Sequence, residues 1–127
     1  MIKKRILVVD DDEDVRILVR KALVQGGHQV WEAAGGAEAL RLLESGTPDL
    51  VLLDLNMPPP DGHEVLRVIR SRESTRSIPV VVLTAHGDEQ SARTSFELGA
   101  TDFLPKPFTP PQLNARVRSS FAHAARQ

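Results

Sequence analysis

Several short apolar runs in the sequence are followed by side chains that could bind a metal ion or a phosphoryl group. These side chains are the carboxylates of Asp10, Asp11 and Asp54, the hydroxyl of Thr84 and the ammonium of Lys106. Such runs are typical of strands that are buried on both faces of a parallel sheet. Because the carboxyl ends of parallel strands meet at one edge of the sheet, where ligands bind, we expect these side chains to form one cluster.

Three carboxylates in one cluster predict a bound cation. Two carboxylates ~4 Å apart repel each other by ~4 kcal/mol at an effective dielectric constant near 20, and the single charge of Lys106 cannot offset three of them. Mg²⁺ suits a site with one or two direct carboxylate ligands, several waters and room for a phosphate oxygen. We therefore expect an Mg²⁺ site, with Mn²⁺ as an alternative, that a phosphoryl group completes.

Asp54 is the candidate nucleophile of this cluster. A carboxylate can attack phosphorus and form an aspartyl phosphate. The transition state spreads negative charge over three oxygens, so catalysis depends on positioning and on charge neutralisation. We expect the metal to take one oxygen, Lys106 a second, and the Thr84 hydroxyl with the Ala85 backbone N–H the third.

The composition fits one domain over residues 1–127, with a core of about residues 4–122. The chain has 127 residues, of which 41% are hydrophobic, and it contains no cysteine. Its 16 basic and 17 acidic side chains give a net charge of -1, which provides no general attraction for nucleic acid or an anionic membrane. No stretch approaches the ~20 apolar residues of a membrane span. We expect a cytoplasmic protein.

Strand and helix patterns alternate along the whole chain. The expected strands are Ile6–Asp10, His28–Ala33, Leu50–Asp54, Pro79–Thr84 and Thr101–Leu104, with a helical pattern after each of them. This pattern predicts an α/β fold, a flavodoxin-like (βα)5 doubly wound parallel sheet with strand order 2-1-3-4-5. In that order the first and third strands are neighbours, which places their terminal aspartates at the switch point of the sheet.

In these motifs the chain resembles the receiver domain of two-component response regulators. The matching segments occur in order along nearly the whole chain: Val8-Val9-Asp10-Asp11, Asp54 followed by Asn56-Met57-Pro58 and Asp61-Gly62, Thr84-Ala85, and Lys106-Pro107-Phe108. Each segment alone is a weak signal, whereas the ordered set is specific. The resemblance implies a phosphoacceptor switch rather than a classical enzyme, with at most self-catalysed phosphorylation and dephosphorylation.

The resemblance also implies a role for each residue of the cluster. Asp54 would accept a phosphoryl group from a sensor histidine kinase or a phosphotransfer protein. Asp11, Asp54 and the Asn56 backbone carbonyl would ligate Mg²⁺, and Asp10 would act through a water. Lys106 would pair with the phosphate, and its peptide bond to the following proline would be cis.

A conformational switch is implied as well. Thr84 would move toward the phosphate and Phe103 would swing inward behind it. The signal would leave through the face made by the fourth helix (around 92–98), the fifth strand (101–104) and the last helix (from Pro110), to a downstream protein or output domain. A homodimer through the same face is a further expectation, with no direct contact to nucleic acid or membrane.

Two residues depart from the common pattern of the family. Phe103 stands where tyrosine is common, so its outward state lacks a hydroxyl hydrogen bond. His86 occupies a position that, with Asn56, lies beside the attacking water in this family. We hypothesise that His86 alters autodephosphorylation.

Other functions fit parts of the sequence. Asp10 and Asp11 could belong to a solvated turn that caps the first helix. A phosphatase of the haloacid-dehalogenase type would use Asp10 as its nucleophile in an Asp10-x-Asp12 motif, but it needs a later acidic pair, and no acid follows Lys106. A receiver-like module that binds partners without phosphorylation is the third alternative.

The remaining aromatic and histidine side chains are interpreted as structural. Phe96 is expected to pack in the core. His28, His63 and His123 have no spacing that suggests a metal site and are expected at the surface.

Overall fold

The fold was obtained as a computed structural model that describes residues 3–85 and 87–125. A five-stranded parallel sheet forms its centre, in the order β2-β1-β3-β4-β5. Its strands are β1 (Arg5–Val9), β2 (Gln29–Ala33), β3 (Leu50–Asp54), β4 (Val80–Ala85) and β5 (Asp102–Lys106). The helices are α1 (Glu13–Gln25), α2 (Gly36–Ser45), α3 (Gly62–Ser71), α4 (Glu89–Glu97) and α5 (Pro110–Ala125). The predicted flavodoxin-like order is confirmed.

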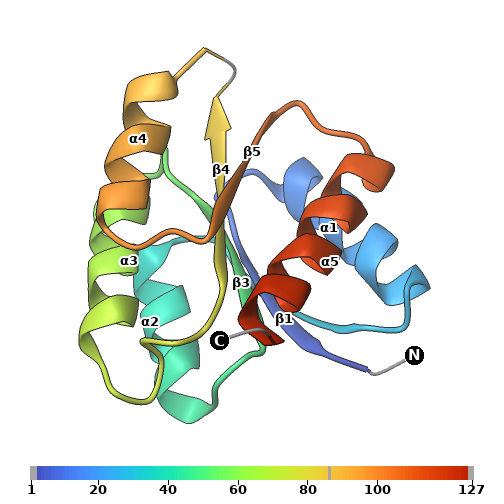
Figure 1. Ribbon diagram of the computed structural model, residues 1–127, viewed down its shortest axis with the longest axis horizontal. Coiled ribbons are helices and arrows are strands. Elements are labelled where there is room, and N and C mark those ends of the chain that lie inside the picture. Colours follow the sequence, from blue (N-terminus) through green and yellow to red (C-terminus); the bar gives the residue numbers. More distant parts are fainter. Residues whose placement is uncertain (1–2, 86, 126–127) are drawn as a thin grey trace.

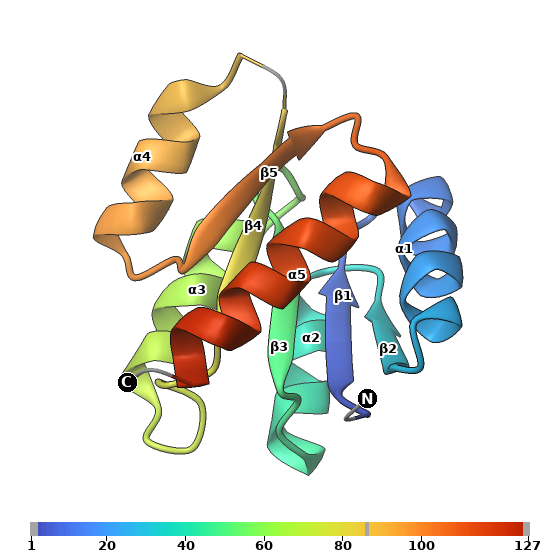
Figure 2. The same ribbon diagram turned by 45° about the vertical axis from the view of Figure 1, so that its right-hand side comes forward.

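Helices cover both faces of the sheet. Figures 1 and 2 show α1 and α5 on one face and α2, α3 and α4 on the other. Successive strand residues alternate between the two layers, because side chains of a strand point to opposite faces. Leu7 and Val9 pack in the cluster on the α2–α3 side, whereas Ile6 and Val8 pack with α1 and α5. β3 is therefore buried along its whole length and β1 from Ile6 to Val9, as their continuous apolar runs predict.

Polar side chains fix the starts of three helices close to the carboxyl edge of the sheet. Asp12 caps α1 by accepting a hydrogen bond from the Asp14 N–H. Asp61 and Glu64 form a reciprocal capping box at α3. Thr109 accepts a hydrogen bond from the Gln112 N–H at the start of α5. These caps satisfy N–H groups that a helix leaves unpaired, so each loop at this edge ends at a defined residue.

Two predictions about the last third of the chain need correction. The fifth strand was expected to end at Leu104, but β5 continues through Pro105 to Lys106. β5 is an edge strand, where a proline is tolerated because no central ladder hydrogen bond is lost. Phe96 was expected in the core, yet 43% of it is exposed, because α4 buries only Ala92 and Ser95.

The histidines differ from one another. His123 is exposed, but His28 and His63 are half-buried, contrary to expectation. The Nε2 atom of His63 lies 3.2 Å from the Ser91 carbonyl oxygen, which links the start of α3 to α4. Among the described residues, no helix is long and apolar enough to cross a membrane.

Candidate functional site

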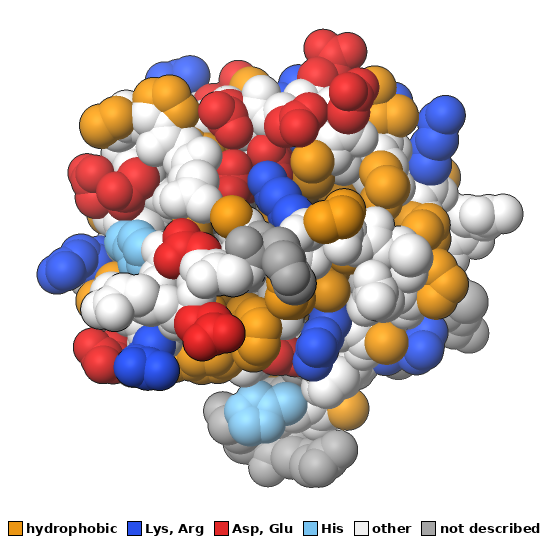
Figure 3. Space-filling view, turned by 90° about the horizontal axis from the view of Figure 1, so that it is seen from above, with side chains coloured by type: hydrophobic (Ala, Val, Ile, Leu, Met, Phe, Trp, Pro, Cys, Tyr) orange, Lys and Arg blue, Asp and Glu red, His pale blue; other side chains and the backbone are white. Residues whose placement is uncertain are grey.

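The side chains that could do chemistry gather at the carboxyl edge of the sheet. Viewed from above this edge, the surface shows acidic side chains beside a basic one near its middle (Figure 3). Three of the acids come from the ends of β1 and β3, which are neighbours in the sheet. The strand order therefore brings together residues from distant parts of the chain, as predicted.

Asp10, Asp11 and Asp54 form a compact group of carboxylates. One carboxylate oxygen of each lies within 4.8 Å of the others. Asp10 and Asp54 are buried, with 0% and 2% of their surface exposed, whereas Asp11 is exposed. The group is thus open to solvent on the side of Asp11, where a hydrated ion or a phosphoryl group could enter.

Lys106 is the cation of the site. Its Nζ lies 2.7 Å from Asp10 Oδ2 and 3.4 Å from Asp54 Oδ1. The longer course of β5 makes this contact possible, since Lys106 pairs with Ala85 at the end of β4. The peptide bond between Lys106 and Pro107 is cis, as the family resemblance implied. Three carboxylates and one ammonium leave two negative charges uncompensated, which fits a divalent cation.

Burial and charge shift the pKa of Asp54 upward. Burial, followed by the charge of Asp10, raises the pKa of Asp54 from 3.8 to about 6. The hydrogen bond from the Asn56 N–H (3.1 Å) and the charge of Lys106 act in the opposite direction but do not cancel this rise. For Lys106, burial alone would lower the pKa, but its contacts with Asp10 and Asp54 raise it. Lys106 therefore stays charged, and Asp54 binds a proton more readily than an exposed aspartate.

Main-chain contacts around the loop after β3 hold Asp54 in place. Its Leu55 N–H donates to the Leu83 carbonyl oxygen (3.1 Å), and Asn56 is exposed at the rim. Gly62, the first residue of α3, packs so closely that a Cβ atom there would lie 2.3 Å from the Asp54 carbonyl oxygen. Only glycine allows this approach, which fixes α3 against the end of β3.

Thr84 and Ala85 form the neighbouring edge at the end of β4. The register pairs Asp54 with Leu83 and Ala85 with Lys106, so Thr84 lies between these positions. Thr84 is buried and Ala85 is exposed. A cavity of about 540 Å³ lies beside them and is lined in part by Phe103. The Phe103 ring meets the Phe96 ring edge-on, with the two ring centroids 5.9 Å apart. Space for a movement of Phe103 is therefore present.

The structure distinguishes between the aspartates after β1. Asp12 Oδ1 accepts from the Asp14 N–H and serves as the cap of α1, as expected, and it does not join the carboxylate group. An Asp10-x-Asp12 phosphatase motif thus loses its second member. His86, the tuning residue proposed from sequence, lies outside the described residues.

Arg16 and Glu32 were not predicted as residues of the site. The Arg16 Nη1 donates to the Asp10 carbonyl oxygen at 2.8 Å, and its Nε lies 3.3 Å from Glu32 Oε1. An arginine near the start of the first helical segment and an acid in the second strand were visible in the sequence. Only the pairing of β1 with β2 shows that they meet at the site.

Comparison with known proteins agrees with this geometry. The family model described as "Response regulator receiver domain" matches residues 6–118. A probable transcriptional regulator, ycf27, from Cyanophora paradoxa is 44% identical over 117 residues, covering 92% of this chain and 48% of the relative. The alkaline phosphatase synthesis transcriptional regulatory protein PhoP from Bacillus subtilis (strain 168) is 40% identical, covering 91% of this chain and 48% of that protein. The chain spans about half the length of the curated relatives it matches.

A solved structure shares the complete fold. The crystal structure of a putative response regulator from Chloroflexus aurantiacus J-10-fl superimposes with a TM-score of 0.91 at 36% identity, covering 95% of this chain and 99% of that one. The family match includes the strand ends that carry Asp10, Asp11, Asp54 and Lys106. The chain therefore belongs to the response regulator receiver domain family and is a receiver of two-component signalling.

Proposed function

We propose that Asp54 accepts a phosphoryl group from a sensor histidine kinase or a phosphotransfer protein, in a reaction that requires Mg²⁺. One observation carries this proposal: Asp10, Asp11 and Asp54 lie together, with Lys106 3.4 Å from Asp54. Family membership supports it, because receivers act as phosphorylation switches that work with histidine kinases and output domains.

The donor set fits Mg²⁺. Asp11, Asp54 and the Asn56 backbone carbonyl would hold the ion, and Asp10 would act through a water ligand. Asp10 Oδ2 is buried and, in the described part of the chain, accepts no hydrogen bond of good alignment despite its short ion pair with Lys106. When bound, the ion would supply charge neutralisation at a phosphoryl oxygen.

The protein side chains would act as nucleophile and electrostatic clamp. An Asp54 oxygen forms a bond to phosphorus while the bond from phosphorus to the donor imidazole nitrogen breaks, and the electron pair of that bond leaves with the imidazole. Charge develops on the three equatorial oxygens in this transition state. Lys106 would stabilise one of them, and the Thr84 hydroxyl with the Ala85 N–H would stabilise another.

Phosphorylation would be transmitted by a rearrangement next to the site. We propose that Thr84 moves toward the phosphate and that Phe103 turns inward, which changes the face made by α4, β5 and α5. That face would contact a downstream protein, an output domain or a second copy of the chain. The curated relatives are named as transcriptional regulators, which supports output through an attached domain.

The lifetime of the phosphate would depend on residues at the rim, Asn56 and His86. We expect His86→Ala to change the rate of autodephosphorylation, because an imidazole at that position would lie beside the attacking water. The half-life of the phosphorylated protein, followed by intact mass after removal of the donor, measures this effect. An unchanged half-life shows that His86 has no such role.

Phosphorylation with acetyl phosphate tests the proposed function directly. The protein is incubated with Mg²⁺ and acetyl phosphate, and the modified residue is mapped by mass spectrometry. Label on Asp54 that depends on Mg²⁺ and is absent from Asp54→Asn supports the proposal. Label on Asp10 with steady turnover of phosphate esters indicates the phosphatase. A chain that binds Mg²⁺ but takes no label indicates a module that acts without phosphorylation.

A further inference from the structure

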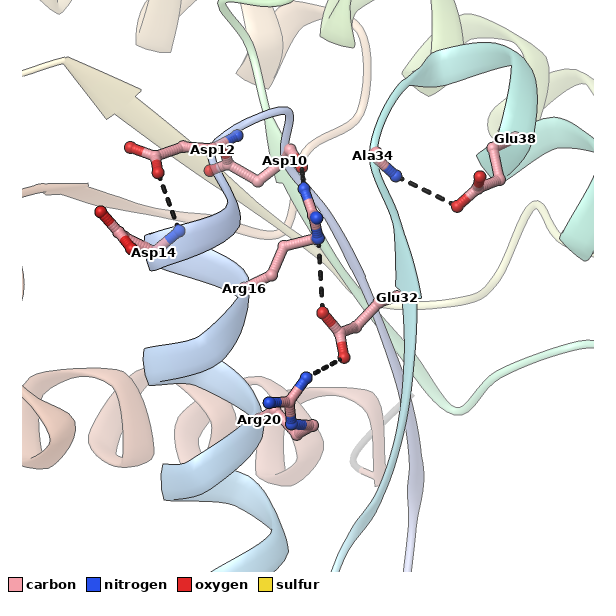
Figure 4. A network of polar contacts seen from close by, with 8 residues as sticks. All are labelled: Asp10, Asp12, Asp14, Arg16, Arg20, Glu32, Ala34 and Glu38. Atoms are coloured by element: carbon pink, nitrogen blue, oxygen red, sulfur yellow. Dashed lines mark hydrogen bonds and ion pairs between the residues drawn. The ribbon is translucent and has the colours of Figure 1, made fainter.

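A network of charged side chains connects β2 to the acidic site. Figure 4 shows Arg16 between Asp10 and Glu32, with Arg20 on the far side of Glu32. The Arg16 Nη1 donates to the Asp10 carbonyl oxygen at 2.8 Å, and its Nε lies 3.3 Å from Glu32 Oε1. The Arg20 Nη1 lies 2.6 Å from Glu32 Oε2. The side chain of Arg16 is 15% exposed and that of Arg20 45% exposed, so Arg16 is the inner member.

Arg16 completes the set of contacts that holds Asp10. The Asp10 N–H donates to the Ala33 carbonyl oxygen at 3.1 Å, and Asp10 Oδ1 accepts from the Asp12 N–H at 2.9 Å. Its Oδ2 pairs with Lys106. The carbonyl oxygen is the remaining polar atom of Asp10, and the guanidinium of Arg16 binds it.

The position of Asp11 depends on this carbonyl. The peptide group that joins Asp10 to Asp11 is planar, so the direction of the Asp10 carbonyl sets the orientation of the Asp11 backbone. Among residues 3–85 and 87–125, no hydrogen bond or ion pair holds the exposed carboxylate of Asp11. The backbone therefore sets the direction in which the Asp11 side chain leaves the main chain, and from there its carboxylate comes within 4.8 Å of those of Asp10 and Asp54.

We propose that Arg16 is a positioning residue for the metal site, and that Glu32 holds its guanidinium in place. Arginine suits this role because one planar group can pair with the carboxylate on its Nε side and donate to the carbonyl through Nη1 at the same time. A lysine ammonium is a point charge and cannot span both acceptors in this geometry. The inference rests on the proposed Mg²⁺ site and adds a residue that does not touch the ion.

Charge and positioning predict opposite effects on metal affinity. If Arg16 acted only through its charge, its removal would relieve repulsion of a cation, and Mg²⁺ would bind more tightly. If Arg16 orients Asp11, its removal weakens binding. Loss of a residue that orients a metal ligand typically lowers metal affinity by about 10- to 100-fold. The sign of the change therefore separates the two roles.

The test is a calorimetric titration of metal-free protein with Mg²⁺ for wild type, Arg16→Gln, Arg16→Lys and Arg20→Gln. We expect Kd to rise about 10-fold or more in Arg16→Gln and to stay raised in Arg16→Lys, which keeps the charge. Arg20→Gln is the matched control: it removes the same charge from the same network without touching Asp10. Its Kd is expected to stay within about twofold of wild type.

A metal-free readout complements the titration. We expect faster hydrogen–deuterium exchange in the segment of residues 10–12 of Arg16→Gln than of Arg20→Gln, because only the first loses the contact to Asp10. If Arg16→Gln does not fold, Arg16→Lys keeps the charge but cannot span both acceptors, and a raised Kd is again expected.

Three results would contradict either the positioning role of Arg16 or the metal site on which it depends. Binding of Mg²⁺ to Arg16→Gln that is as tight as in wild type, or tighter, refutes the positioning role while the proposed function stands. An equal loss of affinity in Arg20→Gln assigns the effect to the packing of α1 on β2 and also refutes it. A wild-type protein that binds no Mg²⁺ refutes the metal site itself, and the inference with it.

Discussion

The surroundings of Asp54, the proposed phosphoacceptor, make this carboxyl group costly to ionise. The carboxylate is nearly completely buried beside a second buried carboxylate, and its pKa is raised to about 6. A pKa that is higher in the folded than in the unfolded state means that the folded state binds the proton more tightly. This contribution to stability is complete below the unfolded value of 3.8 and is lost as the pH rises through about 6.

Asp54→Asn is expected to stabilise the protein at pH 7 when no Mg²⁺ is present. Each pKa unit corresponds to ~1.4 kcal/mol, and part of the gain is lost with the Lys106 contact, so we expect a gain of about 2 kcal/mol. Urea unfolding with a chelator at pH 7.5 and pH 4.5 measures it, and the gain should nearly vanish at the lower pH. Glu97→Gln removes the same charge from an exposed position and should change little. If the Asp54→Asn protein is no more stable than wild type at pH 7.5, ionisation of Asp54 does not carry the free-energy cost expected from its raised pKa.

Lys106→Met should separate metal binding from phosphoryl transfer. Lys106 lowers the pKa of Asp54, so its removal raises that pKa further. It also removes a cation from the site, which should leave Mg²⁺ affinity at pH 8 equal or higher. Loss of a group that stabilises transition-state charge typically costs about 100-fold or more in rate. We expect a decrease of this size in the rate of labelling by acetyl phosphate.

The control for Lys106 is Lys21→Met, which removes an exposed lysine from α1. Labelling at the wild-type rate is expected there. Wild-type labelling of Lys106→Met would show that Lys106 does not stabilise the transferred group.

At the scale of the elements, closely packed main-chain atoms hold the site in place. α3 begins at Gly62, directly against the carbonyl of Asp54. Because a side chain at this position would collide with main-chain atoms, the clash cannot be relieved by a rotamer change. The start of α3 and the end of β3 must separate to accept it.

Gly62→Ala is expected to destabilise the protein by about 2 kcal/mol or more and to slow labelling of Asp54. Overpacking of this kind typically costs ~1–3 kcal/mol, and the contact here is with backbone. Gly35→Ala is the matched control, since a Cβ there meets nothing within 4 Å and its φ of -173° suits any residue. Thermal unfolding and labelling rates compare the two variants, and equal behaviour would refute the packing argument.

For the whole molecule, the two exposed large hydrophobic residues of the described chain lie on different helices. Phe96 of α4 is 43% exposed and contacts the Phe103 ring, whereas Val24 of α1 is 54% exposed and lies on the other face of the sheet. α4 buries only Ala92 and Ser95, so it is the helix with the least anchoring in the core. A change at Phe103 could thus move α4 at small cost.

We expect phosphorylation to promote a homodimer through α4, β5 and α5. Sedimentation velocity with and without acetyl phosphate measures the monomer–dimer equilibrium. Phe96→Asp should abolish the phosphorylation-dependent dimer because it places a charge in the apolar contact, while Val24→Asp should leave it intact. Dimer formation by Phe96→Asp equal to that of wild type would exclude this face as the interface.

The sequence was sufficient to predict the strand order and the acidic cluster, because these depend on patterns along the chain. Apolar runs predict buried strands whatever the details of packing, and parallel strands carry their end residues to one edge. The limits of β5 and the exposure of Phe96 were predicted wrongly. Both depend on which elements lie at the border of the fold, and an edge strand tolerates Pro105 where a central strand would not.

Contacts between elements that are remote in the sequence became evident only in the folded chain. Sequence patterns were enough to predict that Asp10, Asp11, Asp54 and Lys106 would meet, because each lies at the end of a strand or within two residues of it. Folding alone decided the raised pKa of Asp54, which needs burial, and the approach of Gly62 to the Asp54 carbonyl. It also decided the position of Arg16, whose reach to Asp10 depends on how α1 crosses β1 and β2.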